Sequence, residues 1–393
     1  MRSSRNRRTA NEADRYKKLK VVSSPHNTPG GPSSLVDHVE DILAHSETQQ
    51  LLSYFDKVVC DSLVIENQDI PNPFRAYVLP FAYEHGGILH AVLCLAECHM
   101  IGLDDKGEDM TLALVLILLL VDICESGIST HGVHLTGTSI ICGKICERPN
   151  AAESPRKSFL LAILAWLDVL RGFSGAEKLS YHQTVREQVF RAEYFNLETL
   201  VGCPVDFFYS IGTVLETAKN HMNGIVSLDD FQTVLSNAKR FFQSWNADDS
   251  VYPSNDPMWK VLAEAYRHVC IIRILRFPDT CAIPCSAVEI QTSVAAILDV
   301  AAEIPTDSPW FKRLVFPPFM AGTETAVPHQ RGYVDLCMNE IKRTTGFQHL
   351  AIRDILTKVW DARRGQLNMA VNVPWMEFTC SKDLVRQHDY LFL

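Results

Sequence analysis

The feature that most constrains this chain is a series of apolar segments at helical spacing. In the first of them, Leu52, Phe55 and Val59 follow one another at intervals of three or four residues, which predicts a helix with one buried face. Ser46, followed three residues later by Gln49, predicts a capping box at the start of this helix. The opening part of the chain is therefore expected to be helical.

Proline and glycine punctuate the region that follows. Asn72-Pro73 predicts a new helix start with Pro at the first helical position, and Pro80 predicts an end or kink in that segment. Gly86-Gly87 precedes residues 88–101, which are apolar on nearly every side. That composition predicts a deeply buried helix.

The rest of the chain repeats this helical character. Further helices are predicted at 110–124, 138–146, 159–171, 206–218, 228–245, 259–276, 287–304, 333–345 and 351–364. Residues 104–109 read as a polar turn and residues 127–137 as a connection, and Ser227 with Asp230 predicts a helix cap. We find no strand-like alternation, no alternation of strands with helices and no clear repeat. The prediction is a single large all-α domain over residues 35–393, onto which the tail from Asn372 docks.

The charge of the chain is unevenly distributed. Residues 1–20 carry eight Arg or Lys and two acidic residues, a net charge of +6. Because the whole chain has a net charge of −9, the remaining residues have a net charge of −15. An acidic body argues against nucleic-acid binding through that body, whereas a basic head can contact a polyanion or an import receptor. Residues 1–34 end in a Pro/Gly/Ser-rich stretch, which predicts a disordered basic tail and linker.

Within the basic tail, two pairs of basic residues resemble a loose bipartite nuclear-import signal. They are Arg7-Arg8 and Lys17-Lys18, separated by eight residues. A solvated charged tail is the alternative interpretation of the same residues.

The cysteines indicate a reducing compartment. The chain has twelve Cys in apolar segments and a charged N-terminus without an apolar leader, so reduced, buried thiols in a nuclear or cytosolic protein are expected.

The longest uncharged, apolar run, Met110–Val121, has 12 residues, whereas a membrane-spanning helix needs about 20. We therefore predict a core helix and no membrane association.

Several Cys/His groups are candidate metal sites. They are Cys94 and Cys98 with His90 and His99, His131 and His134 with Cys142 and Cys146, Cys281 and Cys285 near Cys270, and the lone Cys60. Structural zinc prefers C-x2-C pairs or a compact set, and Cys in an apolar helix usually acts as a small hydrophobe. We predict no metal site and no cofactor; the set around His131 is the best alternative.

An acidic motif supports an alternative from another class of protein. Asp104, Asp105 and Glu108 match the DDxx(D/E) pattern with which all-α terpene synthases hold Mg²⁺ and a diphosphate, and carboxylates suit a hard cation. A solvated acidic turn explains the same residues, and Gly107 argues against a helix through them. The second metal motif is incomplete, since Asn237 stands where Glu is wanted. We predict that the chain is not an enzyme.

Several segments in series resemble one known family, the fungal-specific transcription factor domain. They are Tyr54, Phe55, Val59 and Cys60; Asn72–Arg75 and Val78–Pro80; Leu89–Leu93, Leu95, Ala96 and His99; His134–Ile141; Ala263–Arg276; Ile304–Glu324 with Arg331; and Val359–Arg364 with Trp375. The chain departs from the family at His131, where Trp is frequent, and at Thr138, where Ala is usual. The resemblance covers roughly residues 45–390, in the expected order.

The resemblance implies an all-α regulatory domain of a fungal transcription regulator in the nucleus. It also implies a preceding six-cysteine zinc cluster, but residues 1–59 contain no Cys. Without that cluster no predicted element enters the major groove, so direct sequence-specific DNA binding is doubtful. The expected mode of action is through a DNA-binding or transcriptional partner protein, or through a small-molecule effector in the helical core. Homodimerisation, and a zinc cluster encoded upstream of Met1, stay open.

Overall fold

The structure is a computed structural model. It describes residues 37–63, 72–101, 105–129, 132–148, 154–192, 197–325, 327–365, 372–379 and 389–392. The predicted tail, including Arg7, Arg8, Lys17 and Lys18, lies outside the described residues, as do Asp104 and His131.

The described residues are almost entirely helical, so the predicted all-α class is confirmed. The chain divides into two compact units, residues 1–100 and residues 101–393. The boundaries 1–34 and 35–393 remain a prediction. None of the described helices combines the length and apolarity that a bilayer crossing requires.

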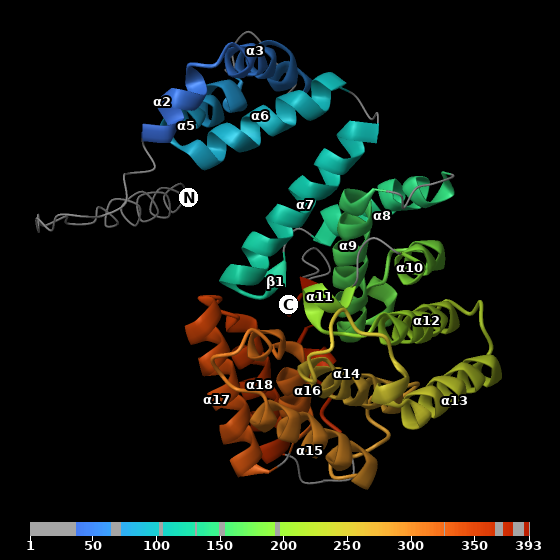
Figure 1. Ribbon diagram of the computed structural model, residues 1–393. Helices are drawn as coiled ribbons and strands as arrows, with labels where there is room; N and C mark the ends of the chain where they lie inside the picture. Colours follow the sequence, from blue (N-terminus) through green and yellow to red (C-terminus); the bar gives the residue numbers. More distant parts are fainter. Residues whose placement is uncertain are drawn as a thin grey trace, which may run out of the picture. The chain divides into compact units, whose positions relative to one another are not determined.

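The first unit packs short helices against one long helix (Figure 1). Its elements are α2 (Asp37–Leu43), α3 (Ser46–Tyr54), a π-helical turn (Phe55–Val59), α4 (Cys60–Leu63), a second π-helical turn (Phe74–Val78), α5 (Leu79–Glu84) and α6 (Gly86–Ile101). The core includes Leu52, Phe55 and Leu89. The expectation that residues 88–101 are buried on all sides is wrong, because Ile88 and Met100 are exposed.

The helix starts in this unit bear out one of the two capping predictions. The Oδ1 atom of Asn72 accepts hydrogen bonds from the backbone N–H groups of Phe74 (3.0 Å) and Arg75 (3.4 Å), as expected of an N-cap. The capping box at Ser46 is wrong: Ser46 is the first residue of α3, and Gln49 donates to the carbonyl of Leu43 instead (2.7 Å). Boundaries shifted by one residue are enough to lose such a motif.

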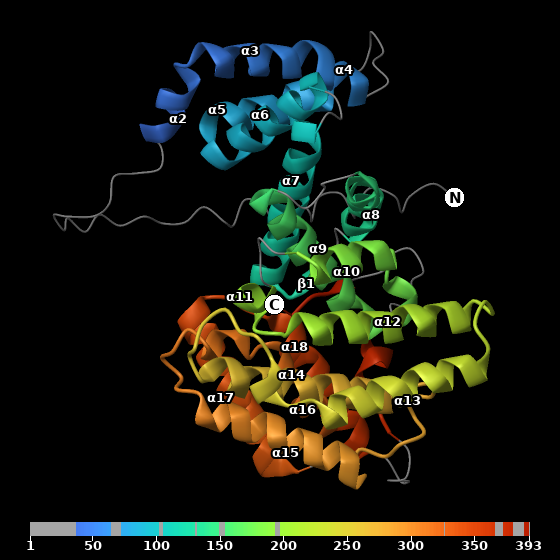
Figure 2. The ribbon, with the colours of Figure 1, turned by 45° about the vertical axis from the view of Figure 1, so that its right-hand side comes forward.

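The second unit is a larger assembly of helices (Figures 1 and 2). Its helices are α7 (Asp105–Glu125), α8 (Gly132–Glu147), α9 (Pro155–Ser174), α10 (Gln183–Phe190), α11 (Leu197–Val201), α12 (Val205–Met222), α13 (Leu228–Ser244), α14 (Met258–Leu275), α15 (Val288–Glu303), α16 (Phe316–Glu324), α17 (Pro328–Thr345) and α18 (Leu350–Arg364). Short 3-10 turns lie at Ala176–Lys178, Ala247–Asp249, Phe311–Arg313 and Trp375–Phe378.

Two helices form the centre of this unit. In α9 every residue from Leu160 to Ser174 is buried, and most of α14 is buried too. α14 packs against α12, α13, α15 and α16, and α9 packs against α7, α8, α10 and α12. Because these helices are enclosed, any charged residue in them has to find its partner inside the protein.

Two helix starts differ from the prediction. The polar residues 105–109 form the first turns of α7 and not a separate turn. Acidic side chains near the N-terminus stabilise a helix, because they interact favourably with its dipole. Gly107 lies within α7, where its carbonyl accepts a hydrogen bond from Thr111 Oγ1 (2.8 Å). Likewise α8 begins at Gly132 and includes Gly137, because burial of one helix face outweighs the weak helix propensity of glycine.

The C-terminal segment docks onto the second unit, as predicted. Strand β2 (Asp389–Tyr390) pairs antiparallel with β1 (Ile128–Ser129), a pairing that no sequence pattern indicated. Leu391 donates its backbone N–H to the carbonyl of Gly127 (3.0 Å). Gly127 has a φ of +77°, and a Cβ there would lie 3.2 Å from the Phe392 ring. Glycine is therefore needed at this turn for two reasons.

Candidate functional site

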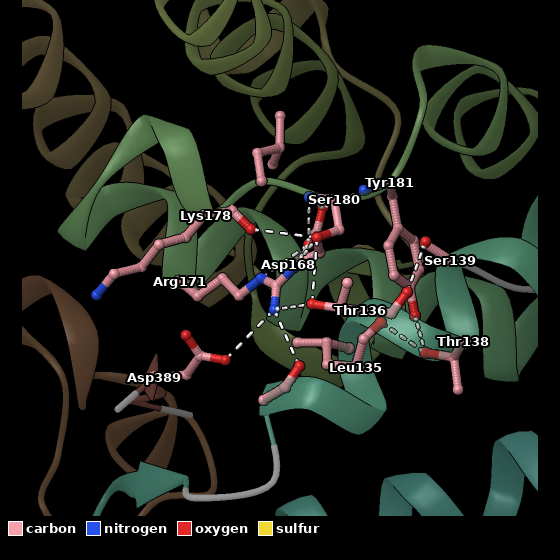
Figure 3. A network of polar contacts seen from close by, with 12 residues as sticks. Leu135, Thr136, Thr138, Ser139, Asp168, Arg171, Lys178, Ser180, Tyr181 and Asp389 are labelled. Atoms are coloured by element: carbon pink, nitrogen blue, oxygen red, sulfur yellow. Dashed lines mark hydrogen bonds and ion pairs between the residues drawn. The ribbon is translucent and has the colours of Figure 1, made fainter. Parts of the chain in front are cut away.

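The most extensive polar network shown lies on the central helix α9 (Figure 3). The carboxylate of Asp168 accepts hydrogen bonds from Arg171 Nε (3.0 Å) and from the backbone N–H groups of Ser180 and Tyr181 (2.9 Å each). Burial raises the pKa of Asp168, and Arg171 and these N–H groups act in the opposite direction. The network holds the turn after α9 against the helix, which is a structural role.

Arg171 extends this network to the C-terminal segment. Its Nη1 lies 3.3 Å from Asp389 Oδ2, 3.3 Å from the carbonyl of Gly132 and 3.1 Å from Thr136 Oγ1. Asp389 is so close to Gly132 that a Cβ on the glycine would lie 1.7 Å from Asp389 Oδ2. Arg171 therefore joins α8, α9 and β2 at one buried point (Figure 3).

A second buried network joins α14, α16 and α18. Glu324 accepts a hydrogen bond from Arg276 Nε (3.0 Å) and pairs with Arg276 Nη2 as well, and it lies 3.7 Å from Arg363 Nη2. Arg363 also donates to Asn372 Oδ1 (3.1 Å). Two guanidinium groups thus share one buried carboxylate, and burial lowers the pKa of Arg363.

Arg273, one turn before Arg276, is buried without such pairing. Its Nε and Nη1 atoms have no hydrogen-bond partner among the described residues. The guanidinium lies over the ring of Phe277, 3.9 Å from its centroid, which is cation–π geometry. Burial lowers the pKa of Arg273 to about 9.

A serine, a histidine and a glutamate come together between α14 and α15, as in a catalytic triad. His268 lies 3.1 Å from Ser293 Oγ through Nδ1 and 3.2 Å from Glu264 Oε1 through Nε2. The Ser293 hydroxyl belongs to a side chain that is only 2% exposed, and it lines none of the cavities described below. A nucleophile needs access to its substrate, so this set links two helices and does not form an active site.

A cavity with a volume of about 330 Å³ lies between α17 and α18. Its apolar lining residues include Met338, Ile352 and Leu356, and His349 also lines it. This volume is at the lower end of the range of small-molecule sites, about 300–1,000 Å³. The cavity is our candidate functional site.

A second cavity, of about 470 Å³, lies near the start of α12 and the end of α13. Carboxylates of Glu198 and Asp206 and the aromatic rings of Phe241, Trp245 and Tyr252 line it, and its described lining contains no Lys, Arg or His. Burial raises the pKa of both carboxyl groups. This lining disfavours an anionic ligand.

The structure describes one carboxylate of the DDxx(D/E) motif, that of Glu108. Glu108 is buried and forms a bidentate ion pair with Arg148 (2.8 and 2.9 Å). Asp104 and the side chain of Asp105 lie outside the described part of the chain. The Glu108 carboxylate is therefore already engaged by a guanidinium that joins α7 to the residue following α8.

In the Cys/His groups, buried cysteines such as Cys142 belong to the core, whereas His90, His99 and His134 are exposed. Cys142 is fully buried on α8, and burial raises its pKa to about 12 and that of Cys146 to about 11. Such thiols stay protonated and pack as hydrophobes. Over the described residues, no three His, Cys, Asp or Glu side chains are placed to hold a metal ion. His131 and the side chain of Cys98 lie outside this description.

Taken together, the described chain is all-α, buried charges such as Arg171 and Arg276 are tied into structural pairs, and helices of the second unit line small cavities. The family model of the fungal specific transcription factor domain matches residues 50–110 and 102–393. The chain belongs to this family of fungal transcription regulators. Comparison with curated proteins and with solved structures gives no match.

Sequence reasoning missed the residues of these networks and the cavity. Asp168, Arg171 and Arg276 lie in segments predicted to be helices, and a charge within a largely apolar helical segment was the available signal. For His349 there was no such signal, because it lies between two predicted helices, where histidine is ordinary.

Proposed function

We propose that this protein regulates transcription in the nucleus without being an enzyme. Its helical body acts through a DNA-binding or transcriptional partner protein, or responds to a bound small-molecule effector. The match of the family model to residues 50–110 and 102–393 carries the proposal. The net charge of −15 outside residues 1–20 supports indirect action, since DNA phosphates repel an acidic body.

Each mode of action has support in the second unit. The cavity of about 330 Å³ between α17 and α18 favours an effector. Exposed apolar side chains favour a partner protein: Ile117 and Val121 on α7, and Val133 and Ile140 on α8, are all more than half exposed. Exposed apolar residues of this kind often mark interaction surfaces.

A tethering experiment tests the regulatory role. The full chain is fused to a heterologous DNA-binding domain and placed at a reporter promoter in a fungal strain. We expect reporter expression to change severalfold relative to the DNA-binding domain alone. Unchanged expression, with the fusion folded and present at the promoter, would contradict a regulatory role.

A binding experiment separates indirect from direct action. The purified full chain is titrated with duplex DNA at several salt concentrations. We expect only weak binding that disappears as salt is raised. Tight, sequence-dependent binding at physiological salt would overturn action through a partner.

The enzyme alternative is tested with its own substrate class. Incubation with a prenyl diphosphate and Mg²⁺ is expected to release no pyrophosphate above background, and Asp104→Ala is expected to change nothing. Release of pyrophosphate that the Asp104→Ala variant abolishes would establish the enzyme and refute the regulator-only proposal.

A further inference from the structure

His349 is buried in the second unit without the hydrogen bonds that a buried imidazole normally has. Its side chain is 6% exposed, and both ring nitrogens are covered and have no hydrogen-bond partner among the described residues. A buried polar group left unpaired costs roughly 1–3 kcal/mol. Such a group calls for an explanation in a folded protein.

The backbone at His349 is also in an unfavourable conformation. It has φ 41° and ψ 44°, the left-handed region, and is the one residue other than glycine with a positive φ in the described part of the chain. Non-glycine residues in this region often belong to functional sites. The loop before α18 therefore concentrates two energetic penalties on one histidine.

Its neighbours hold this loop in place. Gln348 donates its backbone N–H to the carbonyl of Cys124, and Ala351 donates to that of Ser126, each at 2.9 Å. Cys124 belongs to α7, and Ser126 lies in the turn that precedes β1. The loop thus connects the α17–α18 cavity with the end of α7.

The charges that line the cavity favour a ligand with no net charge. Two carboxylates, Asp335 and Asp354, and two cations, Lys342 and Arg353, line it, so the formal charges cancel. Asp354 already pairs with Lys358 (2.6 Å), and Arg353 lies 3.4 Å from Asn339 Oδ1. The remaining lining combines apolar residues with uncharged polar ones. Burial keeps the imidazole of His349 uncharged, with one N–H donor and one acceptor nitrogen.

We propose that this cavity binds a small neutral organic molecule whose amide or similar carbonyl group forms a hydrogen bond with the imidazole of His349. The apolar part of the molecule packs on Met338, Ile352 and Leu356. The inference rests on the proposed function, because the bound molecule acts as an effector only if the protein is a regulator. A charged molecule of the same size loses its hydration and meets a lining whose positive and negative charges offset each other.

Binding is linked to the conformation of the loop. Both nitrogens of His349 are covered, so the ring or the loop 346–349 shifts when a ligand group reaches them. The backbone hydrogen bonds to Cys124 and Ser126 carry this shift to the end of α7. Occupancy of the cavity and the geometry at the end of α7 therefore depend on each other.

Benzamide, a small neutral amide with an apolar ring, is the probe. The full chain, ¹⁵N-labelled at its fourteen histidines, is titrated with benzamide, and the imidazole resonance absent from His349→Asn is followed. We expect a saturable shift of this resonance in the millimolar range. Benzoate, the charged analogue, is expected to bind at least about tenfold more weakly, roughly the contribution of one hydrogen bond.

Two variants and a matched control complete the test. Leu350 lines the cavity and is 58% exposed, whereas Leu336 on α17 is 66% exposed and does not line it. Leu350→Trp narrows the cavity and is expected to weaken benzamide binding about tenfold, while Leu336→Trp leaves it unchanged. His349→Asn, which tolerates the left-handed backbone, is expected to weaken binding similarly when binding is followed by ligand-observed NMR.

The outcomes are distinct. The absence of a saturable shift with benzamide, equal binding by all variants, or tighter binding of benzoate would overturn the proposed ligand site. None of these measurements involves DNA or transcription. Failure of the site therefore leaves the regulatory proposal standing, because that proposal is tested separately by the reporter, DNA-binding and prenyl diphosphate experiments.

Discussion

Asp389 lies 3.3 Å from the guanidinium of Arg171, although 218 positions separate the two residues in the chain. Arg171 belongs to the fully buried part of α9, and Asp389 begins the short strand β2. This pair is the polar part of the contact that fastens the C-terminal segment to the second unit. All six tryptophans lie in residues 101–393, so tryptophan fluorescence reports the unfolding of this unit.

Replacing Asp389 tests this attachment. Asp389→Asn removes the charge beside Arg171, and we expect the free energy of unfolding in urea to fall by about 1–3 kcal/mol. Asp361→Asn is the control, because Asp361 pairs with Arg364 on the surface and such pairs contribute about 0–1 kcal/mol. Equal effects of the two variants would show that the Arg171–Asp389 pair adds no stability.

Two glycines of α8 are predicted to respond with opposite signs. Gly132→Ala places a Cβ against Asp389, whereas a Cβ at Gly137 meets nothing within 4 Å. We expect Gly132→Ala to destabilise the unit by about 1–3 kcal/mol. Gly137→Ala should stabilise it by about 0.5–1 kcal/mol, because alanine favours the helix. Urea unfolding measures both, and stabilisation by Gly132→Ala would refute the close approach of Asp389.

Arg276, which directly follows α14, is paired, whereas Arg273 on α14 is not paired among the described residues, and this difference gives another contrast. Glu324→Gln leaves Arg276 and Arg363 buried without their shared carboxylate, and we expect a loss of about 3 kcal/mol. Arg273→Met removes a buried charge whose Nε and Nη1 are unpaired, so we expect a gain of about 1 kcal/mol or more. A large loss of stability in Arg273→Met would mean that its cation–π contact outweighs the penalty of burial.

His349 gives the second unit a specific pH dependence. Burial lowers its pKa from 6.5 to about 4 in the folded protein, so between these values the unfolded chain binds a proton that the folded chain does not. Stability from this residue is therefore complete above about pH 6.5 and is lost as the pH falls towards 4. From pH 7 to 5 the loss amounts to about 2 kcal/mol.

The measurement is urea unfolding of wild type and His349→Asn at pH 7 and pH 5. We expect the wild type to lose about 2 kcal/mol more than the variant between these pH values. His329→Asn, which replaces an exposed histidine on α17, is expected to behave as the wild type. Identical pH dependence of wild type and His349→Asn would contradict the buried, neutral imidazole.

The basic tail is tested in cells. A fluorescent fusion in which Arg7, Arg8, Lys17 and Lys18 are changed to Ala is expected to lose nuclear accumulation. The matched control changes Arg2, Arg5, Arg15 and Lys20 to Ala, which removes the same charge from the same segment. Loss of accumulation in both variants would assign import to net charge, and retention in both would refute the signal.

The family and the all-α class could be predicted from the sequence because both depend on local patterns repeated along the chain. Helices such as α13 and α15 were predicted almost at their observed bounds, and Ser227 caps α13 by accepting a hydrogen bond from the Asp230 N–H (3.1 Å). Predictions failed where glycine or polar residues suggested a break. Helix α7 continues through Gly107, and helix α8 begins at Gly132. In both helices, packing of one face outweighs the weak helix propensity of glycine.

The sequence by itself determined the helical class, the family, the asymmetry of charge and the docking of the C-terminal tail. Only the tertiary structure decided which buried charges meet, as in Arg171 with Asp389 and Arg276 with Glu324. It alone also placed His349 in a cavity without a hydrogen-bond partner among the described residues. The physical reason is that helical periodicity is a local property, readable over a few turns, whereas the pairing of buried groups depends on which distant segments pack together.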